Sequence, residues 1–157
     1  MYRIISCPVG KKSELLELNN LELKTLQRLV GGLIEVLPIS ENGRVIIICN
    51  EEGLIRDMSL NRVVYDEDTK QPLSIISGDF LFLRETEDEN GELDFCGFED
   101  EEMINHYLTT YQYPERILRT QLGQVIVIPF DPDHKTKEYN RETDEPLYEA
   151  LDVLDDI

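Results

Sequence analysis

The run Val45–Cys49 (VIIIC) constrains the fold more than any other part of the chain, because each of its side chains is apolar. Successive side chains of a β-strand point to opposite faces, so a strand that is apolar throughout needs a cover on both sides. The apolar segment Leu33–Ile39 precedes this run, and Asn42-Gly43 lies between the two. Asn-Gly between β-branched runs is a strong sign of a hairpin. We therefore predict a central strand at Val45–Cys49, covered on each side and paired with Leu33–Ile39.

Other strands are predicted where short apolar runs end in turn residues. They are Tyr2–Ser6, Glu14–Leu18 pairing back on it, Ser74–Glu85 as one or two strands with Gly78 as a bulge or bend, and Gly123–Pro129. A second hairpin is predicted over Glu87–Phe95, with Asn90-Gly91 at its tip.

Three segments have the apolar spacing of a helix. The first begins after Asn19-Asn20, which offers an N-cap, and ends at Gly31-Gly32, where glycine readily takes the left-handed conformation. The second is Glu99–Tyr111, whose acidic first turn suits the helix dipole and which Pro114 stops. The third is a terminal helix over Thr143–Leu154.

A length of 157 residues suits one ordinary domain, and we find no internal repeat and no linker. Several strands and a few helices without regular alternation indicate an α+β fold, with a mostly antiparallel sheet and two or three helices packed on it. The single domain is predicted to span residues 1–157. Residues 114–157 would hold its last strand and the acidic terminal helix.

The cysteine pattern and the apolar runs predict a cytoplasmic location. Cys7, Cys49 and Cys96 are odd in number and widely spaced, which indicates a reducing compartment. The N-terminal residues lack the long apolar region of a signal peptide. The longest apolar runs are too short to span a bilayer.

Net charge is the outlying property of the sequence. Thirty-three acidic residues against fifteen basic ones give a formal charge of −18. Such a polyanion cannot favourably neutralise phosphates, so we expect it to bind neither nucleic acid nor an anionic membrane. The expected partner is the basic surface of a host nucleic-acid-binding protein.

The carboxylates are concentrated in two blocks. No lysine or arginine lies between Glu85 and Glu102, and Arg141 is the only one between Glu138 and Ile157. We predict that the first block binds the partner, together with two carboxylates in the loop after Cys49. The predicted partner-binding residues are Glu51, Glu52, Glu87, Asp88, Glu89, Glu92, Asp94, Glu99, Asp100, Glu101 and Glu102.

The polar stretch Cys49–Arg62 allows two interpretations. In the first, Asn50–Gly53 forms a turn that ends in a left-handed glycine and leads into Leu54–Arg56, and its carboxylates lie in water. In the second, Asn50, Glu51 and the pair Asn61-Arg62 converge on a ligand, since loops on a rigid sheet often carry function. The sequence does not decide between them.

No motif indicates an enzyme, a metal site or a cofactor. His106 and His134 are far apart in the sequence, and neither neighbours a cysteine. Cys96 lies among carboxylates, which should raise the pKa of its thiol and make it a poor nucleophile. Phosphate-binding glycine loops, the serine-hydrolase elbow and the zinc-protease motif are all missing from the sequence. We therefore predict a protein that is not an enzyme and binds neither metal nor cofactor.

The chain contains the stretches GGLIEVLPI, VIIICNEEG, NRVVYDED and IISGDFLFL, in that order, followed by EEMINHYL in an acidic helix. Together these stretches resemble a family of small proteins found on bacterial phages, plasmids and conjugative elements. The resemblance covers about residues 21–111, and its most specific pieces are Gly32, Glu35, Pro38, Asn50–Gly53, Asn61-Arg62 and Gly78. This family is known only as a domain of unknown function. The resemblance implies an origin on a mobile element and implies no activity.

Three functions remain open at this point. The first is an anti-CRISPR or anti-restriction inhibitor that mimics nucleic acid, because carboxylates on one face of a strand recur at about 6.5–7 Å, comparable to neighbouring phosphates. The second is a non-catalytic binding or regulatory module of phage replication or plasmid conjugation, with acidity serving solubility alone. The third, an enzyme, is kept only as an alternative to our prediction, because no motif supports it.

Overall fold

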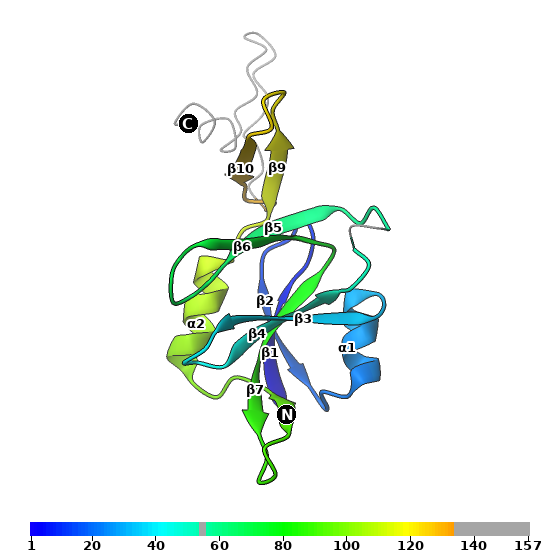
Figure 1. The fold of residues 1–157 in the computed structure, drawn as a ribbon, viewed down its shortest axis with the longest axis vertical. Coiled ribbons are helices and arrows are strands. Elements are labelled where there is room, and N and C mark those ends of the chain that lie inside the picture. Colours follow the sequence, from blue (N-terminus) through cyan, green and yellow to red (C-terminus); the bar gives the residue numbers. More distant parts are fainter. Residues whose placement is uncertain (54–55, 134–157) are drawn as a thin grey trace.

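The computed structural model describes residues 1–53 and 56–133, which form ten strands and two helices (Figure 1). In chain order these are β1 (Tyr2–Cys7), β2 (Glu14–Leu18), α1 (Leu23–Val30), β3 (Ile34–Ser40), β4 (Val45–Asn50), β5 (Leu60–Tyr65), β6 (Pro72–Ser77), β7 (Phe80–Glu87), β8 (Leu93–Cys96), α2 (Glu101–Thr110), β9 (Glu115–Arg119) and β10 (Val125–Pro129). The central sheet has the order β2-β1-β7-β4-β3, and β8 extends it by pairing with β7. Strands β5 and β6 form one small sheet, and β9 and β10 form another.

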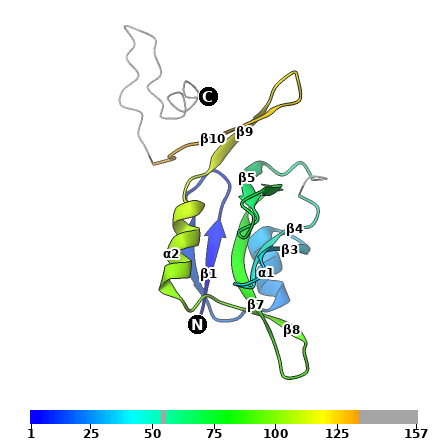
Figure 2. The same cartoon turned by 60° about the vertical axis from the view of Figure 1, so that its left-hand side comes forward.

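Every strand pair in the described residues is antiparallel. The predicted antiparallel sheet with helices packed on it is therefore confirmed in its broad form. The helices hold a small share of the chain and lie on either side of the central sheet (Figures 1 and 2).

Strand β4 lies between β3 and β7, and all six of its residues are buried. Ile46 and Ile48 join the apolar cluster beneath α1. Val45, Ile47 and Cys49 point to the other face, where α2 and the β5–β6 sheet supply the cover. The prediction of a central strand covered on both sides is confirmed.

The larger core lies between the central sheet, α2 and the β5–β6 sheet. The ring of Phe82 contacts Tyr107 and Tyr111 of the α2 region, with ring centroids 5.2 Å and 4.7 Å apart. The predicted apolar face of the second helix is confirmed, since Ile104, Tyr107 and Tyr111 are buried.

Helix α1 begins later than the sequence predicts. Its N-cap is Glu22, which has no side-chain cap bond, and not Asn19 or Asn20. The Asn20 side chain still accepts hydrogen bonds, from the Glu22 amide at 3.0 Å and from the Thr25 hydroxyl at 2.7 Å. It therefore links the approach to the helix with Thr25 in the first turn of α1, although Asn20 is not the N-cap. The predicted end is confirmed, because Gly31 has a φ of 81°.

Two strands were not foreseen. Strand β5 is buried in spite of its polar pair Asn61-Arg62, and β9 carries three charges in five residues. The segment Ser74–Glu85 is split between two sheets, with Gly78 at a φ of 83° as the link. The turn after β4 does not lead into a strand at Arg56, which lies in a second turn, and the next strand starts at Leu60.

The predicted terminal helix Thr143–Leu154 lies outside the described residues, as do Leu54 and Ile55. Within the part of the chain that is described, no helix is long and apolar enough to cross a membrane.

Arg62 is the largest fully buried side chain, with 1% of its surface exposed. Its Nε donates to the Tyr111 carbonyl at 3.1 Å, and its two terminal nitrogens donate to the carbonyls of Pro8 at 3.0 Å and Lys11 at 2.6 Å. The Asn61 side chain accepts a further bond at 2.6 Å. One guanidinium thus joins strand β5, the β1–β2 loop and the end of α2.

Replacing Arg62 by methionine should lower the free energy of unfolding by about 3–5 kcal/mol, because the buried Tyr111 carbonyl and the buried Asn61 side chain lose their donor and the part-buried carbonyls of Pro8 and Lys11 lose one as well. Urea denaturation followed by circular dichroism measures the change. Arg28→Met is the matched control on the exposed face of α1, and we expect it to change stability by less than about 0.5 kcal/mol. Equal stability of the two variants would contradict the role given to Arg62.

Candidate functional site

The β7–β8 hairpin and the start of α2 place the first block of carboxylates at one end of the molecule (Figures 1 and 2). We call this region, Glu87–Asp94 together with Glu99–Glu102, the acidic end. Strand β8 pairs with β7 from Arg84 to Glu87, so the hairpin continues the central sheet beyond β1. The carboxylates of the acidic end are exposed.

Three aspartates of the acidic end stabilise its turns. Asp88 accepts hydrogen bonds from the amides of Asn90 at 2.8 Å and Glu92 at 2.9 Å, across the hairpin tip. Asp100 is the N-cap of α2 and accepts from the Glu102 amide at 2.9 Å. Asp94 accepts from the next amide in the chain. These bonds fix the backbone that displays the other carboxylates.

Two arginines from other elements reach the acidic end. Arg44, in the β3–β4 turn, pairs with Glu87 at 3.0 Å. Arg3 of β1 pairs with Glu101 and also donates to the Glu99 carbonyl at 3.1 Å. The block that is purely anionic in the sequence is therefore partly neutralised in the fold, which a count along the chain cannot reveal.

Four glutamates of the acidic end make no side-chain hydrogen bond or ion pair with the residues that the structure describes. They are Glu89, Glu92, Glu99 and Glu102. Their carboxylates are exposed and remain available to a partner.

Glu51 and Glu52 lie away from the acidic end. In the β4–β7 register Ile48 faces Leu81, so the loop after β4 lies beside the start of β7, whereas Glu87 is at its end. At a rise of about 3.3 Å per residue, roughly 25 Å separates them along the strands. The eleven predicted residues do not form one surface: nine lie together, and these two do not.

The loop after β4 has a structural role. The Asn50 side chain donates to the Val30 carbonyl at the end of α1 at 3.1 Å and accepts from the Glu52 amide at 2.8 Å. The Asn61 amide donates to the carbonyls of Cys7 at 2.7 Å and Gly78 at 2.9 Å.

The small pocket that Asn50 and Glu51 line includes neither Asn61 nor Arg62. These side chains are engaged in separate internal bonds, so the interpretation that they converge on a ligand is not supported. The turn interpretation agrees with the geometry in that Asn50–Gly53 forms a turn, closed by the bond from the Gly53 amide to the Asn50 carbonyl at 3.3 Å. The predicted left-handed conformation of Gly53 is wrong, because its φ is not positive. After Gly53 the chain takes the course described above.

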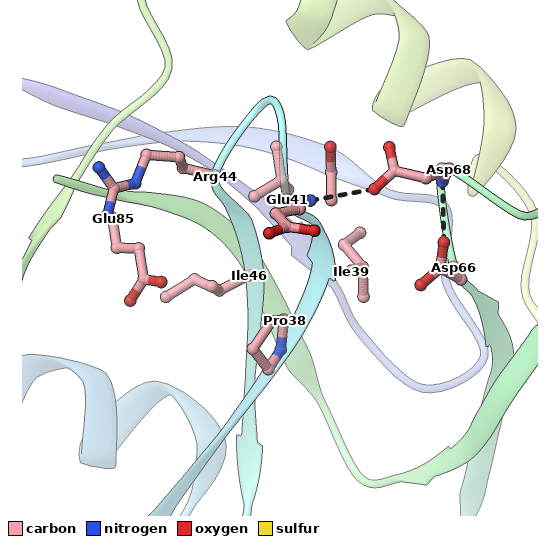
Figure 3. Close-up of a pocket in the computed structure, with 10 residues that line it drawn as sticks. Pro38, Ile39, Glu41, Arg44, Ile46, Asp66, Asp68 and Glu85 are labelled. Atoms are coloured by element: carbon pink, nitrogen blue, oxygen red, sulfur yellow. Dashed lines mark hydrogen bonds between the residues drawn. The ribbon is translucent and has the colours of Figure 1, made fainter.

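An anionic pocket of about 340 Å³ lies between the β3–β4 turn and the turn after β5 (Figure 3). Its charged lining residues are Glu41, Arg44, Asp66, Asp68 and Glu85. Asp68 accepts from the Glu41 amide at 3.2 Å, and Asp66 accepts from the Asp68 amide at 2.9 Å. Backbone hydrogen bonds, first that of Thr69, lower the pKa of Asp66. Because Arg44 also reaches Glu87, the pocket continues the negative surface of the acidic end and disfavours a phosphate ligand.

The profile of a protein family described as "Domain of unknown function (DUF3846)" matches residues 2–112. The chain belongs to this family. The resemblance stated from the sequence is thereby confirmed, and the match begins earlier, at the first strand. Comparisons with curated proteins and with solved structures gave no match.

The DUF3846 match runs from β1 to just beyond α2, so it contains all eleven predicted partner-binding residues. The β9–β10 hairpin follows the matched region. Neither the family description nor the fold names a reaction.

The described residues offer little for metal binding or nucleophilic attack. Across residues 1–53 and 56–133, no three His, Cys, Asp or Glu side chains are grouped closely enough to hold a metal ion. Burial raises the pKa of the Cys7 thiol to about 12 and that of Cys49 to about 11. The pKa of Cys96 is raised too, as predicted, although burial contributes more than the neighbouring carboxylates.

A thiol reagent should distinguish these cysteines. We expect Ellman's reagent to label Cys96 alone in the native DUF3846 protein, because Cys7 and Cys49 are buried, and to label all three cysteines in urea. Since the pKa of Cys96 lies above the ordinary 9.0, the labelling rate should still rise as the pH passes through 9.

The control for this experiment is Cys96→Ser, which should remove native labelling. Native labelling of Cys7 at the same rate as Cys96 would contradict the described packing.

Proposed function

We propose that this DUF3846 protein is an acidic inhibitor from a mobile element, which blocks the nucleic-acid-binding surface of a host defence nuclease. The observation that carries the proposal is that the β7–β8 hairpin and the start of α2, whose sequences hold nine carboxylates, lie at one end of a folded scaffold (Figure 1). The target would be a CRISPR effector or a restriction enzyme, met in the cytoplasm of the bacterial host. The mobile-element origin implied by the sequence resemblance suits this role.

The physical basis of such inhibition is competition for a cationic cleft. A nuclease cleft that neutralises phosphates binds its substrate largely through release of counterions. Fixed rows of carboxylates draw on the same electrostatic attraction and steering. Each exposed ion pair contributes only about 0.2–1 kcal/mol, so many carboxylates must be held together.

In this proposal the carboxylates of the acidic end have two different roles, one structural and one in binding. Asp88 and Asp100 hold the hairpin tip and the helix start, as described above. The four glutamates that have no side-chain partner among the described residues would make the contacts, and the anionic pocket beside Arg44 would enlarge the surface. Glu51 and Glu52 have no part in this arrangement, because they lie at the other end of β7.

A second candidate is a non-catalytic binding or regulatory module of phage replication or plasmid conjugation. The exposed apolar side chains of the β9–β10 hairpin favour it, since an inhibitor that acts only through charge does not need them. This function predicts a partner that stays bound at high salt.

Neutralising the four available glutamates tests the first candidate. In the variant E89Q/E92Q/E99Q/E102Q the caps Asp88 and Asp100 remain, so the fold should survive. The assay is cleavage of labelled DNA or RNA by a panel of purified restriction enzymes and CRISPR effectors. For a nuclease that the wild-type protein inhibits, we expect the variant to need about 30-fold more protein, equivalent to about 2 kcal/mol.

The matched control is E14Q/E17Q/E22Q/E35Q, whose glutamates are exposed on other elements. Each variant neutralises four carboxylates and so changes the formal charge from −18 to −14. The control should inhibit within about twofold of the wild-type protein, because its four glutamates lie outside the proposed interface and form no ion pair with the target. Equal loss in both variants, or no inhibition of any nuclease in the panel, would refute nucleic-acid mimicry by the acidic end.

A further inference from the structure

The β9–β10 hairpin extends away from the body at the end opposite to the acidic end (Figures 1 and 2). It lies beyond the matched family region, which stops at residue 112. Much apolar surface is open on it: Leu118 is 48% exposed, Leu122 is 88% exposed and Val125 is 44% exposed. A two-stranded hairpin is at best marginally stable alone in water, so we expect another protein segment to pack against this apolar surface.

Both faces of this hairpin carry apolar side chains. Cross-strand partners share a face, and the pairs Val127–Ile117 and Ile126–Leu118 lie on opposite faces. The first pair is on the side that faces the β5–β6 sheet, where a pocket of about 270 Å³ is lined partly by Leu60. Of the second pair, Leu118 also borders this pocket and is largely exposed, and Ile126 is half-buried.

The outer edge of β10 differs from the two edges of the central sheet. Strand β10 pairs only with β9 among the described strands, so its second row of backbone groups has no strand partner within residues 1–53 and 56–133. The edge strand β2 carries Glu14 and Glu17, and the edge strand β3 carries Glu35 and Pro38, which are features that deter strand addition. The run Val125–Ile128 has no charge and no proline.

The charges of the hairpin indicate which partner can approach. Arg116 and Arg119 are its exposed charges, and Glu115 is half-buried with its side chain bonded to the Val63 amide at 2.8 Å. The β7–β8 hairpin and the start of α2, which carry the nine carboxylates of the acidic end, lie towards the far end of the long axis of the molecule (Figure 1). A second copy can therefore meet this hairpin without opposing the acidic end.

We propose that β10 pairs with β10 of a second copy of this chain, antiparallel and about a two-fold axis, to form a four-stranded sheet between the copies. Such a contact is self-complementary and closes, as expected for a two-fold dimer. It would cover Val125–Ile128 and direct the two acidic ends outward. The dimer does not depend on the proposed function. Bivalent binding of a target by the two acidic ends would, however, rest on that function.

Light scattering coupled to size-exclusion chromatography tests the dimer on the full chain. Between about 1 and 100 µM, we expect the mass to rise from 18.2 kDa towards twice that value. Val127→Lys should weaken association at least tenfold, because pairing about Val127 sets two lysines opposite each other. Val125→Lys, at a more exposed site, is a second variant whose fold is less at risk.

Leu93→Lys is the matched control, since Leu93 is an exposed leucine on the other hairpin, and it should dimerise like the wild-type protein. Raising the salt should strengthen the dimer, because it screens repulsion between two chains of charge −18, whereas it should weaken binding of a cationic target. The two proposals can therefore fail separately.

Two results would overturn the dimer. One is a monomer at every concentration. If the β10 amides of that monomer exchange slowly, another part of the same chain protects this strand. The other is a dimer that neither lysine variant weakens.

Discussion

The buried guanidinium of Arg62 is the interaction on which the arrangement of this protein depends most. It supplies donors to the part-buried carbonyls of Pro8 and Lys11 in the β1–β2 loop and to the buried carbonyl of Tyr111 at the end of α2. Burial lowers the pKa of Arg62, with Glu115 acting in the opposite direction, yet an arginine stays charged. The β5–β6 sheet, the central sheet and α2 therefore keep one relative placement, and the β9–β10 hairpin is attached where they meet.

Charge and apolarity are separated along the long axis of the molecule (Figure 1). At one end the carboxylates of the β7–β8 hairpin and of α2 face solvent, with Arg3 and Arg44 removing part of the repulsion among them. At the other end an uncharged strand borders solvent. The first end suits contacts that salt weakens, and the second suits contacts that salt leaves intact, so one small fold can offer both kinds of surface.

The sequence predicts the local pairing well and the long-range placement poorly. Val45–Cys49 and the two Asn-Gly turns identify the central strand and two hairpins, because those signals lie within a few residues of each other. Strand β5 is not predicted, because adjacent Asn61 and Arg62 are typical of a loop. Their burial is explained only by hydrogen bonds to carbonyls that are distant in the sequence. Likewise, the separation of Glu51 from Glu87 and the approach of Arg3 to Glu101 follow from the sheet order, which no local pattern encodes.

The close approach at Gly97 has a practical consequence for labelling. A side chain there would come within 3 Å of the backbone of Arg3, and the amide of Phe98 bonds the Arg3 carbonyl at 2.8 Å, so the first residues of the chain are fastened beside β8. A fluorophore on the amino terminus would thus report the environment of the neighbouring glutamates, while a bulky purification tag fused at that position would stand in front of them.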